Sequence, residues 1–205
     1  MSNIPRSSRH VKVAILVVNG VLIPLLGTSL IASTALADWN HASKWKVNGH
    51  WINFVDNKER LRFADITVYD DNYSYGKTKW NAANKVKLNW NQANYKLTIR
   101  DSSDCNWDSL AETNTQGYIL NNRCLMDWAG GNYPGYNGRF TQATTESRRD
   151  RTGSHELGHA LGFKHWFQDG QPCASVMSSV LSDRALGGCD QPTVDDKQEL
   201  KAWNY

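Results

Sequence analysis

The sequence predicts an α+β fold, and three patterns along the chain support this prediction. Short apolar or alternating stretches, typical of strands, occur repeatedly between residues 51 and 125. One segment among them has apolar residues at helical spacing. Two further helical segments follow, of which one carries a group of histidines and the other lies at the end of the chain.

The first predicted elements form a strand, strand, helix, strand order. Residues 51–55 and 64–69 are short apolar or alternating stretches, which favour strands. Within 76–90, apolar residues recur every three or four positions, which predicts a helix. The alternation over 95–99 then predicts another strand.

The second half begins with a predicted strand at 118–125 and an irregular glycine-rich loop at 130–138. The histidine-bearing helix comes next. The last helix begins at Thr193, with acidic residues in its first turn, and we expect Leu200 and Trp203 to face inward.

Residues 1–37 have the pattern of a secretory signal peptide. Basic residues come first, an apolar run follows over 13–31, and small residues precede a cleavage site between Ala37 and Asp38. An uncleaved anchor is the alternative. Cleavage leaves residues 38–205 as a single secreted, extracellular domain without stable membrane association.

The charge of the predicted mature chain gives no reason to expect a nucleic-acid partner. The full chain has 23 basic and 20 acidic residues. Three of the basic residues and none of the acidic ones lie in 1–37, so the remaining chain is formally neutral. We expect a monomer.

In an exported chain, four cysteines most simply form two disulfides. Nearest-neighbour pairing is the prediction, and free buried thiols are the alternative. The predicted bonds are Cys105–Cys124 and Cys173–Cys189.

A short segment carries the residues expected to bind one zinc ion. His155 and His159 are four residues apart, so on a helix both imidazoles leave the same face. Glu156 then lies beside the open zinc position, where a general base is needed. Gly162 allows the chain to turn back after the helix, so that His165 becomes the third ligand.

This extended motif resembles that of the metzincin zinc metallopeptidases, closest to the matrixin branch or its small bacterial relatives. The resemblance covers 143–205 fairly well. It implies an N-terminal twisted mixed sheet with a backing helix, an active-site zinc helix, a methionine turn and a C-terminal helix. Met177, twelve residues after His165, lies where that turn is expected and is interpreted as a hydrophobic floor beneath the zinc.

The resemblance also implies how substrate binds. A protein or peptide substrate in extended form would add to an exposed edge strand, for which 117–124 is the candidate. The loop 167–190 would wall the specificity pocket. Trp166 and Ser179 depart from the pattern of particular branches, so the branch stays open and no tyrosine ligand is expected from the turn.

Together these features predict a secreted zinc-dependent endopeptidase in which Glu156 activates water as the general base. The alternatives are a zinc amidase that acts on cell-wall peptides and a non-catalytic extracellular zinc-containing binding protein.

Structural calcium is a minor alternative, because acidic loop residues are present but no calcium-loop pattern is. The acidic residues concerned are Asp70, Asp71, Asp101 and Asp104. His41 and His50 lack ligand spacing and are interpreted as ordinary polar positions.

Overall fold

The computed structural model describes residues 46–47, 50–51, 54–131, 143–165, 175–178 and 190–203. Several predictions fall outside these residues: the signal peptide, Cys173 with Cys189, Trp166, Ser179 and most of the loop 167–190. None of the helices in the described part of the chain has the length and apolar character that a membrane span requires.

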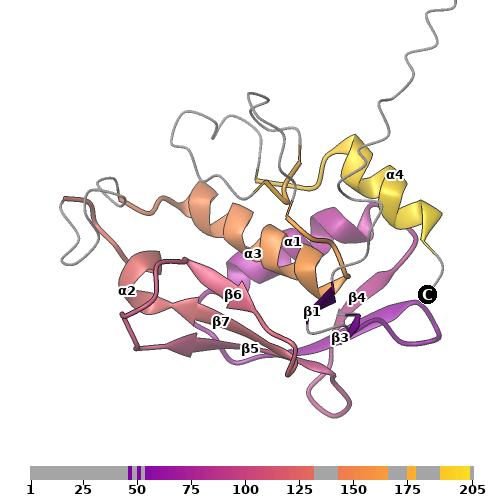
Figure 1. The fold of residues 1–205 in the computed structure, drawn as a ribbon, viewed down its shortest axis with the longest axis horizontal. Helices are drawn as coiled ribbons and strands as arrows, with labels where there is room; N and C mark the ends of the chain where they lie inside the picture. Colours follow the sequence, from indigo (N-terminus) through magenta and orange to yellow (C-terminus); the bar gives the residue numbers. More distant parts are fainter. Residues whose placement is uncertain are drawn as a thin grey trace, which may run out of the picture. The chain divides into compact units, whose positions relative to one another are not determined.

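A mixed five-stranded sheet forms one layer of the fold (Figure 1). Its strands, in the order in which they lie side by side, are β4 (Lys87–Trp90), β3 (Arg60–Asp65), β5 (Leu97–Ser102), β7 (Tyr118–Asn122) and β6 (Ala111–Thr113). Neighbouring strands are parallel except for β6, which runs antiparallel to β7. A separate pair, β1 (Lys46–Val47) and β2 (His50–Trp51), precedes the sheet.

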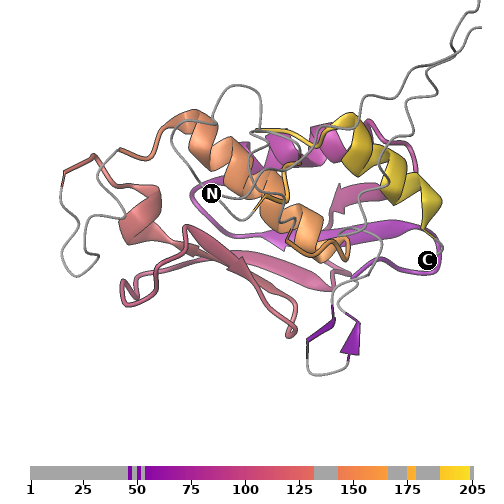
Figure 2. The ribbon, with the colours of Figure 1, turned by 45° about the horizontal axis from the view of Figure 1, so that its top comes forward.

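The helices complete the α+β architecture and confirm the predicted class. They are α1 (Asp70–Asn81), α2 (Arg123–Met126), α3 (Glu146–Ala160) and α4 (Val194–Ala202). Figures 1 and 2 show α1 and α3 on the same face of the sheet. Two glycines allow these helices to approach closely. A Cβ added at Gly76 would lie 2.9 Å from Cα of Ser154, and one at Gly153 would lie 2.8 Å from the carbonyl oxygen of Asn72.

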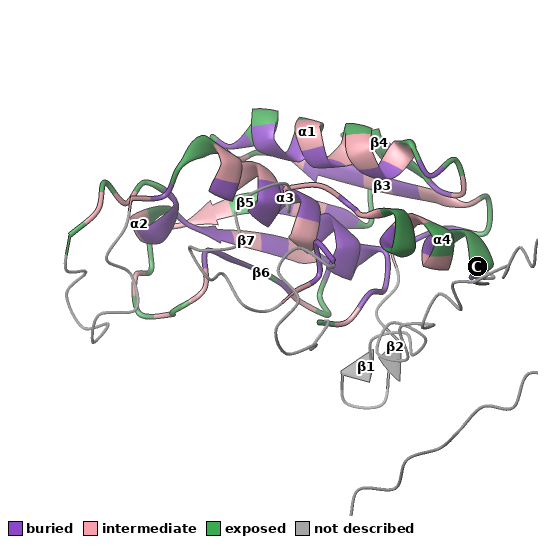
Figure 3. Ribbon diagram, turned by 90° about the horizontal axis from the view of Figure 1, so that it is seen from above, coloured by how far each residue is buried: buried purple, intermediate pink, exposed green. Residues whose placement is uncertain are grey.

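The core lies between the sheet and these two helices (Figure 3). The strands contribute Leu61, Leu97, Ile99 and Ile119, and the helices contribute Tyr73, Trp80 and Leu157, all fully buried. Trp80 also donates a hydrogen bond of 2.8 Å from Nε1 to the carbonyl oxygen of Ser154. This side chain, near the C-terminal end of α1, therefore holds α3 against α1 as well as filling the core.

Two predicted elements have different bounds in the structure. The strand predicted at 64–69 ends at Asp65, whose Oδ1 accepts a hydrogen bond from the backbone N–H of Thr67 and turns the chain. Ile66 and Val68 are consequently exposed. The helix predicted within 76–90 begins six residues earlier and ends at Asn81, because Lys87–Trp90 pairs with β3 as a strand.

The predicted edge strand is wrong. Residues 118–122 form β7, which pairs on both sides, with β5 and with β6, so it offers no free edge. Among the described strands, the edge next to β7 is β6, which the sequence analysis missed. A strand of three residues is too short to show alternation, and its pairing with β7 is what defines it.

The predicted disulfide between Cys105 and Cys124 is present. It joins the segment after β5 to the start of α2, across 19 residues that include β6. The bond therefore closes the loop from which the edge strand is built.

Candidate metal centre

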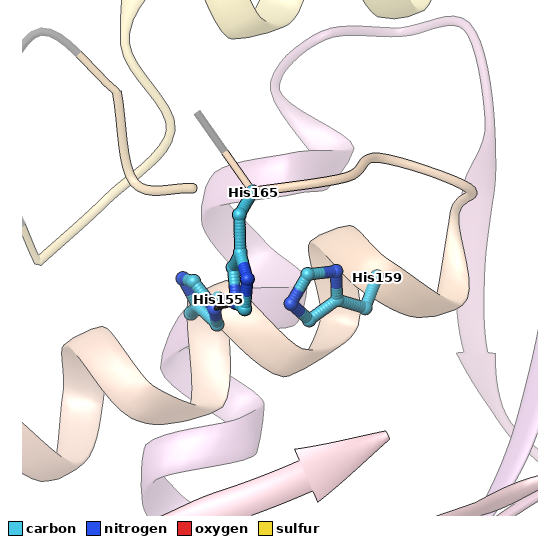
Figure 4. A group of neighbouring side chains, drawn as sticks. All are labelled: His155, His159 and His165. Carbon is cyan, nitrogen blue, oxygen red and sulfur yellow. Dashed lines mark hydrogen bonds between the residues drawn. The ribbon is translucent and has the colours of Figure 1, made fainter. Parts of the chain in front are cut away.

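The three predicted ligands come together at the end of α3 (Figure 4). His155 and His159 lie one helical turn apart on α3. Gly162, with φ of 102°, then reverses the chain, as the sequence predicts. The N–H groups of Gly162 and Phe163 donate to the carbonyl oxygens of His159 and Gly158, which closes the helix and directs the chain toward His165.

The arrangement of the imidazoles fits a tetrahedral zinc ion. One nitrogen of each ring lies within 4.8 Å of those of the other two. The Nε2 atoms of His155 and His165 are 3.2 Å apart. Two ligands at about 2.0–2.1 Å from a tetrahedral zinc ion lie about 3.3 Å apart, so this pair already has the required separation.

Backbone carbonyl groups fix the tautomers of the two helical histidines. Nδ1 of His155 lies 2.8 Å from the carbonyl oxygen of Val176, and Nδ1 of His159 lies 2.8 Å from that of Phe163. A carbonyl oxygen only accepts, so each Nδ1 carries the proton and each Nε2 keeps its lone pair for a metal. Burial lowers the pKa of both rings, that of His159 to about 3, which keeps them neutral.

Glu156 projects from α3 toward the edge strand. Its side chain is buried at 5% exposure, and Oε2 accepts a 2.7 Å hydrogen bond from the hydroxyl of Thr113 in β6. Burial raises the pKa of Glu156 to about 7, although the bond from Thr113 acts in the opposite direction. A divalent cation nearby would favour the ionised form, which is the form that accepts a proton.

Met177 lies fully buried beneath the histidine-bearing helix. A Cβ added at Gly158 would overlap its Sδ and would lie 3.1 Å from Cζ2 of Trp80. Glycine at position 158 is thus required by the close approach of the methionine. Met177, which the sequence predicts as a hydrophobic floor, packs its sulfur against the backbone of α3 between His155 and His159.

Asp196 holds the turn that contains Met177. Its carboxylate is fully buried and accepts from the hydroxyl of Ser175 at 2.5 Å and from the backbone N–H of Val176 at 3.1 Å. It also accepts from the backbone N–H of Thr193, as part of the capping box that begins α4. One acidic side chain therefore joins the methionine turn to the last helix. Leu200 of that helix and Trp203, which directly follows it, are both buried, as predicted.

A cleft of about 280 Å³ opens beside the histidines. One wall is the segment 108–113, which includes β6, and the other is α3 with Ser178. Apart from the three histidines and Glu156, the sequence analysis missed this lining, including Thr113 and Arg151. Thr113 belongs to no recognisable motif, because tertiary packing brings β6 to the site. Arg151 lies one helical turn before His155 on α3, but it is not part of the ligand motif.

Asp101, one of the acidic residues considered for calcium, uses its carboxylate in hydrogen bonds to other residues of the chain. Asp101 accepts hydrogen bonds from the hydroxyl of Thr67, the backbone N–H of Val68 and the side chain of Asn121. These donors occupy its carboxylate and join the loop after β3 to strands β5 and β7. His50 lies in β2, and His41 lies outside the described residues.

We predict that Thr113→Val slows any hydrolysis at this site about fivefold and leaves zinc content unchanged. Valine keeps the shape of threonine but removes a hydrogen bond that holds Glu156, which contributes about 1 kcal/mol. Steady-state rates and metal analysis of the purified variant test this. Thr98→Val, in β5, is the matched control, and an equal loss in both variants would contradict a positioning role for Thr113.

Comparisons with known proteins give little that bears on the chain. No family model matches it, and no curated protein does. Among solved structures, a chain from the "GM1 bound form of the ECX AB5 holotoxin" is similar, with 12% sequence identity and a TM-score of 0.46. The likeness covers 70% of this chain and 79% of that one.

These comparisons correct the function that the sequence predicts. No family model or curated protein identifies the chain as an endopeptidase, and the similar solved structure is described as a toxin and its GM1-bound form. The comparisons therefore give no support to the predicted secreted endopeptidase. At a TM-score of 0.46 the likeness carries neither a fold nor an activity to this chain, so its chemistry rests on the site itself.

Proposed function

We propose that the chain is a zinc-dependent hydrolase in which water attacks a carbonyl carbon. The observation that carries this proposal is the convergence of three imidazole nitrogens beside a buried carboxylate that is not one of the ligands. A structural zinc site closes its fourth position with a protein ligand and needs no base. Three ligands and a neighbouring glutamate instead favour catalysis.

His155, His159 and His165 would hold the ion. Zinc bound there supplies Lewis acidity, which lowers the pKa of a coordinated water and polarises a carbonyl group. Glu156 accepts the proton of the attacking water and returns it to the leaving group. Thr113 holds Oε2 of Glu156, so the carboxylate keeps one orientation during both transfers.

The finer fold assignment belongs to the same proposal. A metzincin-like catalytic domain agrees with the mixed sheet, the backing helix α1, the histidine-bearing helix α3, the turn at Met177 and the C-terminal helix α4. We also propose export, on the pattern of residues 1–37, and a monomeric state. Among the described residues, the outer edge of β6 has no strand partner, and its place beside the cleft supports a binding partner with an extended backbone.

The proposal predicts about one zinc per chain and its loss when a ligand is removed. His165→Ala removes one of three ligands, so zinc affinity and hydrolysis should both fall more than tenfold. His50→Ala, outside the site, is the matched control. Metal analysis, zinc titration against a chromophoric chelator and a panel of fluorogenic amides and esters measure these effects.

Two results would contradict the proposal. Equal zinc affinity in His165→Ala and His50→Ala would show that the histidine group does not hold the ion. Full zinc loading of the native protein, without chelator-sensitive hydrolysis of any amide or ester in the panel, would exclude the hydrolase.

A further inference from the structure

Arg151 is a buried cation in the wall of the cleft. Its side chain is 4% exposed, although it lies among the residues that line the opening beside His155 and Ser178. The guanidinium donates one hydrogen bond, of 3.0 Å, from Nη2 to the carbonyl oxygen of Ser178. Its Nε has no hydrogen-bond partner, and no carboxylate of the described residues forms an ion pair with it.

An arginine in this state is costly, because a buried charge is normally paired and hydrogen-bonded. Burial and, to a smaller extent, the neighbouring charge of Arg148 lower the pKa of Arg151 to about 10. The charge therefore destabilises the free protein. An anion that enters the cleft would relieve this penalty, since it would supply both the missing charge and the missing acceptors.

The position of Arg151 relates such an anion to the metal centre. Residues 151 and 155 are four apart on α3, so they lie on the same face about 6 Å apart along the helix axis. A ligand that bridges the histidine group and Arg151 thus needs its reacting carbonyl and its anionic group separated by about one helical turn. This separation corresponds to a chain of roughly four to five bonds.

The surroundings favour a carboxylate over a more highly charged anion. Asp108, Glu112 and Glu156 also line the cleft, and their charges would oppose a phosphate dianion. A single guanidinium offers a planar pair of donors, which matches the two oxygens of a carboxylate. Among the described residues of the lining, Arg151 is the one arginine beside several carboxylates, so the cleft favours a ligand with a single negative charge at this end.

We infer that Arg151 binds a carboxylate of the substrate, one helical turn from the carbonyl that the metal centre attacks. This inference rests on the proposed hydrolase and adds its substrate class, molecules with an acidic group near the scissile bond. Arg151 is a specificity-determining residue, because it contacts the substrate away from the reacting atoms.

Zinc-binding hydroxamates test the inference through binding alone. The monohydroxamates of succinic, glutaric and adipic acid place a carboxylate at increasing distance from the chelating group, and their primary amides are neutral counterparts of the same shape. Calorimetry on the zinc-loaded protein gives a Kd for each. We expect the acid to bind roughly 10- to 100-fold more tightly than its amide at the best spacing.

Variants separate recognition from a structural role of Arg151. In Arg151→Gln the preference for the acid should vanish while the neutral amide keeps its affinity, and Arg151→Lys should retain part of the preference. Arg149→Gln, on the same helix and paired with Glu146, is the matched control and should behave as the native protein. A purely structural arginine would weaken both ligands equally when replaced.

The outcomes are distinct. Acid and amide of equal affinity in the native protein at every spacing would overturn the inference, and this comparison needs no variant to fold. A preference that persists in Arg151→Gln would overturn it too. If neither ligand bound a zinc-loaded protein, the failure would be that of the proposed metal centre.

Discussion

Replacing Glu156 with glutamine is expected to leave about one zinc per chain and to lower hydrolysis by about 10²- to 10⁴-fold. Glutamine keeps the size of the side chain and can still accept the hydrogen bond from Thr113. It cannot accept a proton from water. The three histidines are unchanged, so metal analysis should report normal zinc while single-turnover rates report the lost base.

The neighbouring carboxylate of Glu112 provides the control. It lies in β6, lines the same cleft and is exposed, but it does not share the hydrogen bond with Thr113. Glu112→Gln should retain activity within a few-fold. Normal turnover in Glu156→Gln would show that water is activated by another group.

Gly158→Ala should lower the free energy of unfolding by about 1–3 kcal/mol, although alanine is the better helix former. The added methyl group would overlap Sδ of Met177 and press on the ring of Trp80. Both neighbours are fully buried, so neither has free space into which it can move. Because Gly158 lies between the histidines of α3, zinc affinity should fall as well.

A double-mutant cycle identifies the cause. Met177→Ala removes the overlapping sulfur and creates a cavity of its own, and the combined variant should be more stable than the sum of the two losses predicts. Urea unfolding of the four proteins gives the coupling energy. If the two losses of unfolding free energy were strictly additive, the contact between residues 158 and 177 would not be the cause of the destabilisation.

The grouping of the three histidines could be predicted because its geometry is local. The spacing of His155 and His159 fixes their common helix face, and Gly162 supplies the reversal that brings in His165. Thr113 could not be found in this way. It reaches Glu156 only because β6 pairs with β7. The three residues of β6 carry no sequence pattern that specifies this pairing.

The errors in the fold have a similar origin. Ile66 and Val68 alternate as strand residues do, but the local hydrogen bond from Thr67 to Asp65 and the start of α1 at Asp70 override the pattern. Lys87–Trp90 continues a helical stripe in sequence, yet it gains a strand partner in β3. In both places, contacts that a linear pattern does not record decide the backbone.

The contacts of Asp196 make the last helix part of the metal centre. The carboxylate receives the N–H of Val176, and the carbonyl group of the same residue receives Nδ1–H of His155. Val176 thus links Asp196, in the first turn of α4, to His155, the first of the proposed zinc ligands. Proteolytic removal of α4 would remove Asp196 and loosen the segment whose carbonyl group orients His155. We expect His155 to lose its fixed orientation, although the cut lies about forty residues away in sequence. Zinc retention is therefore a measure of whether the C-terminal helix is intact.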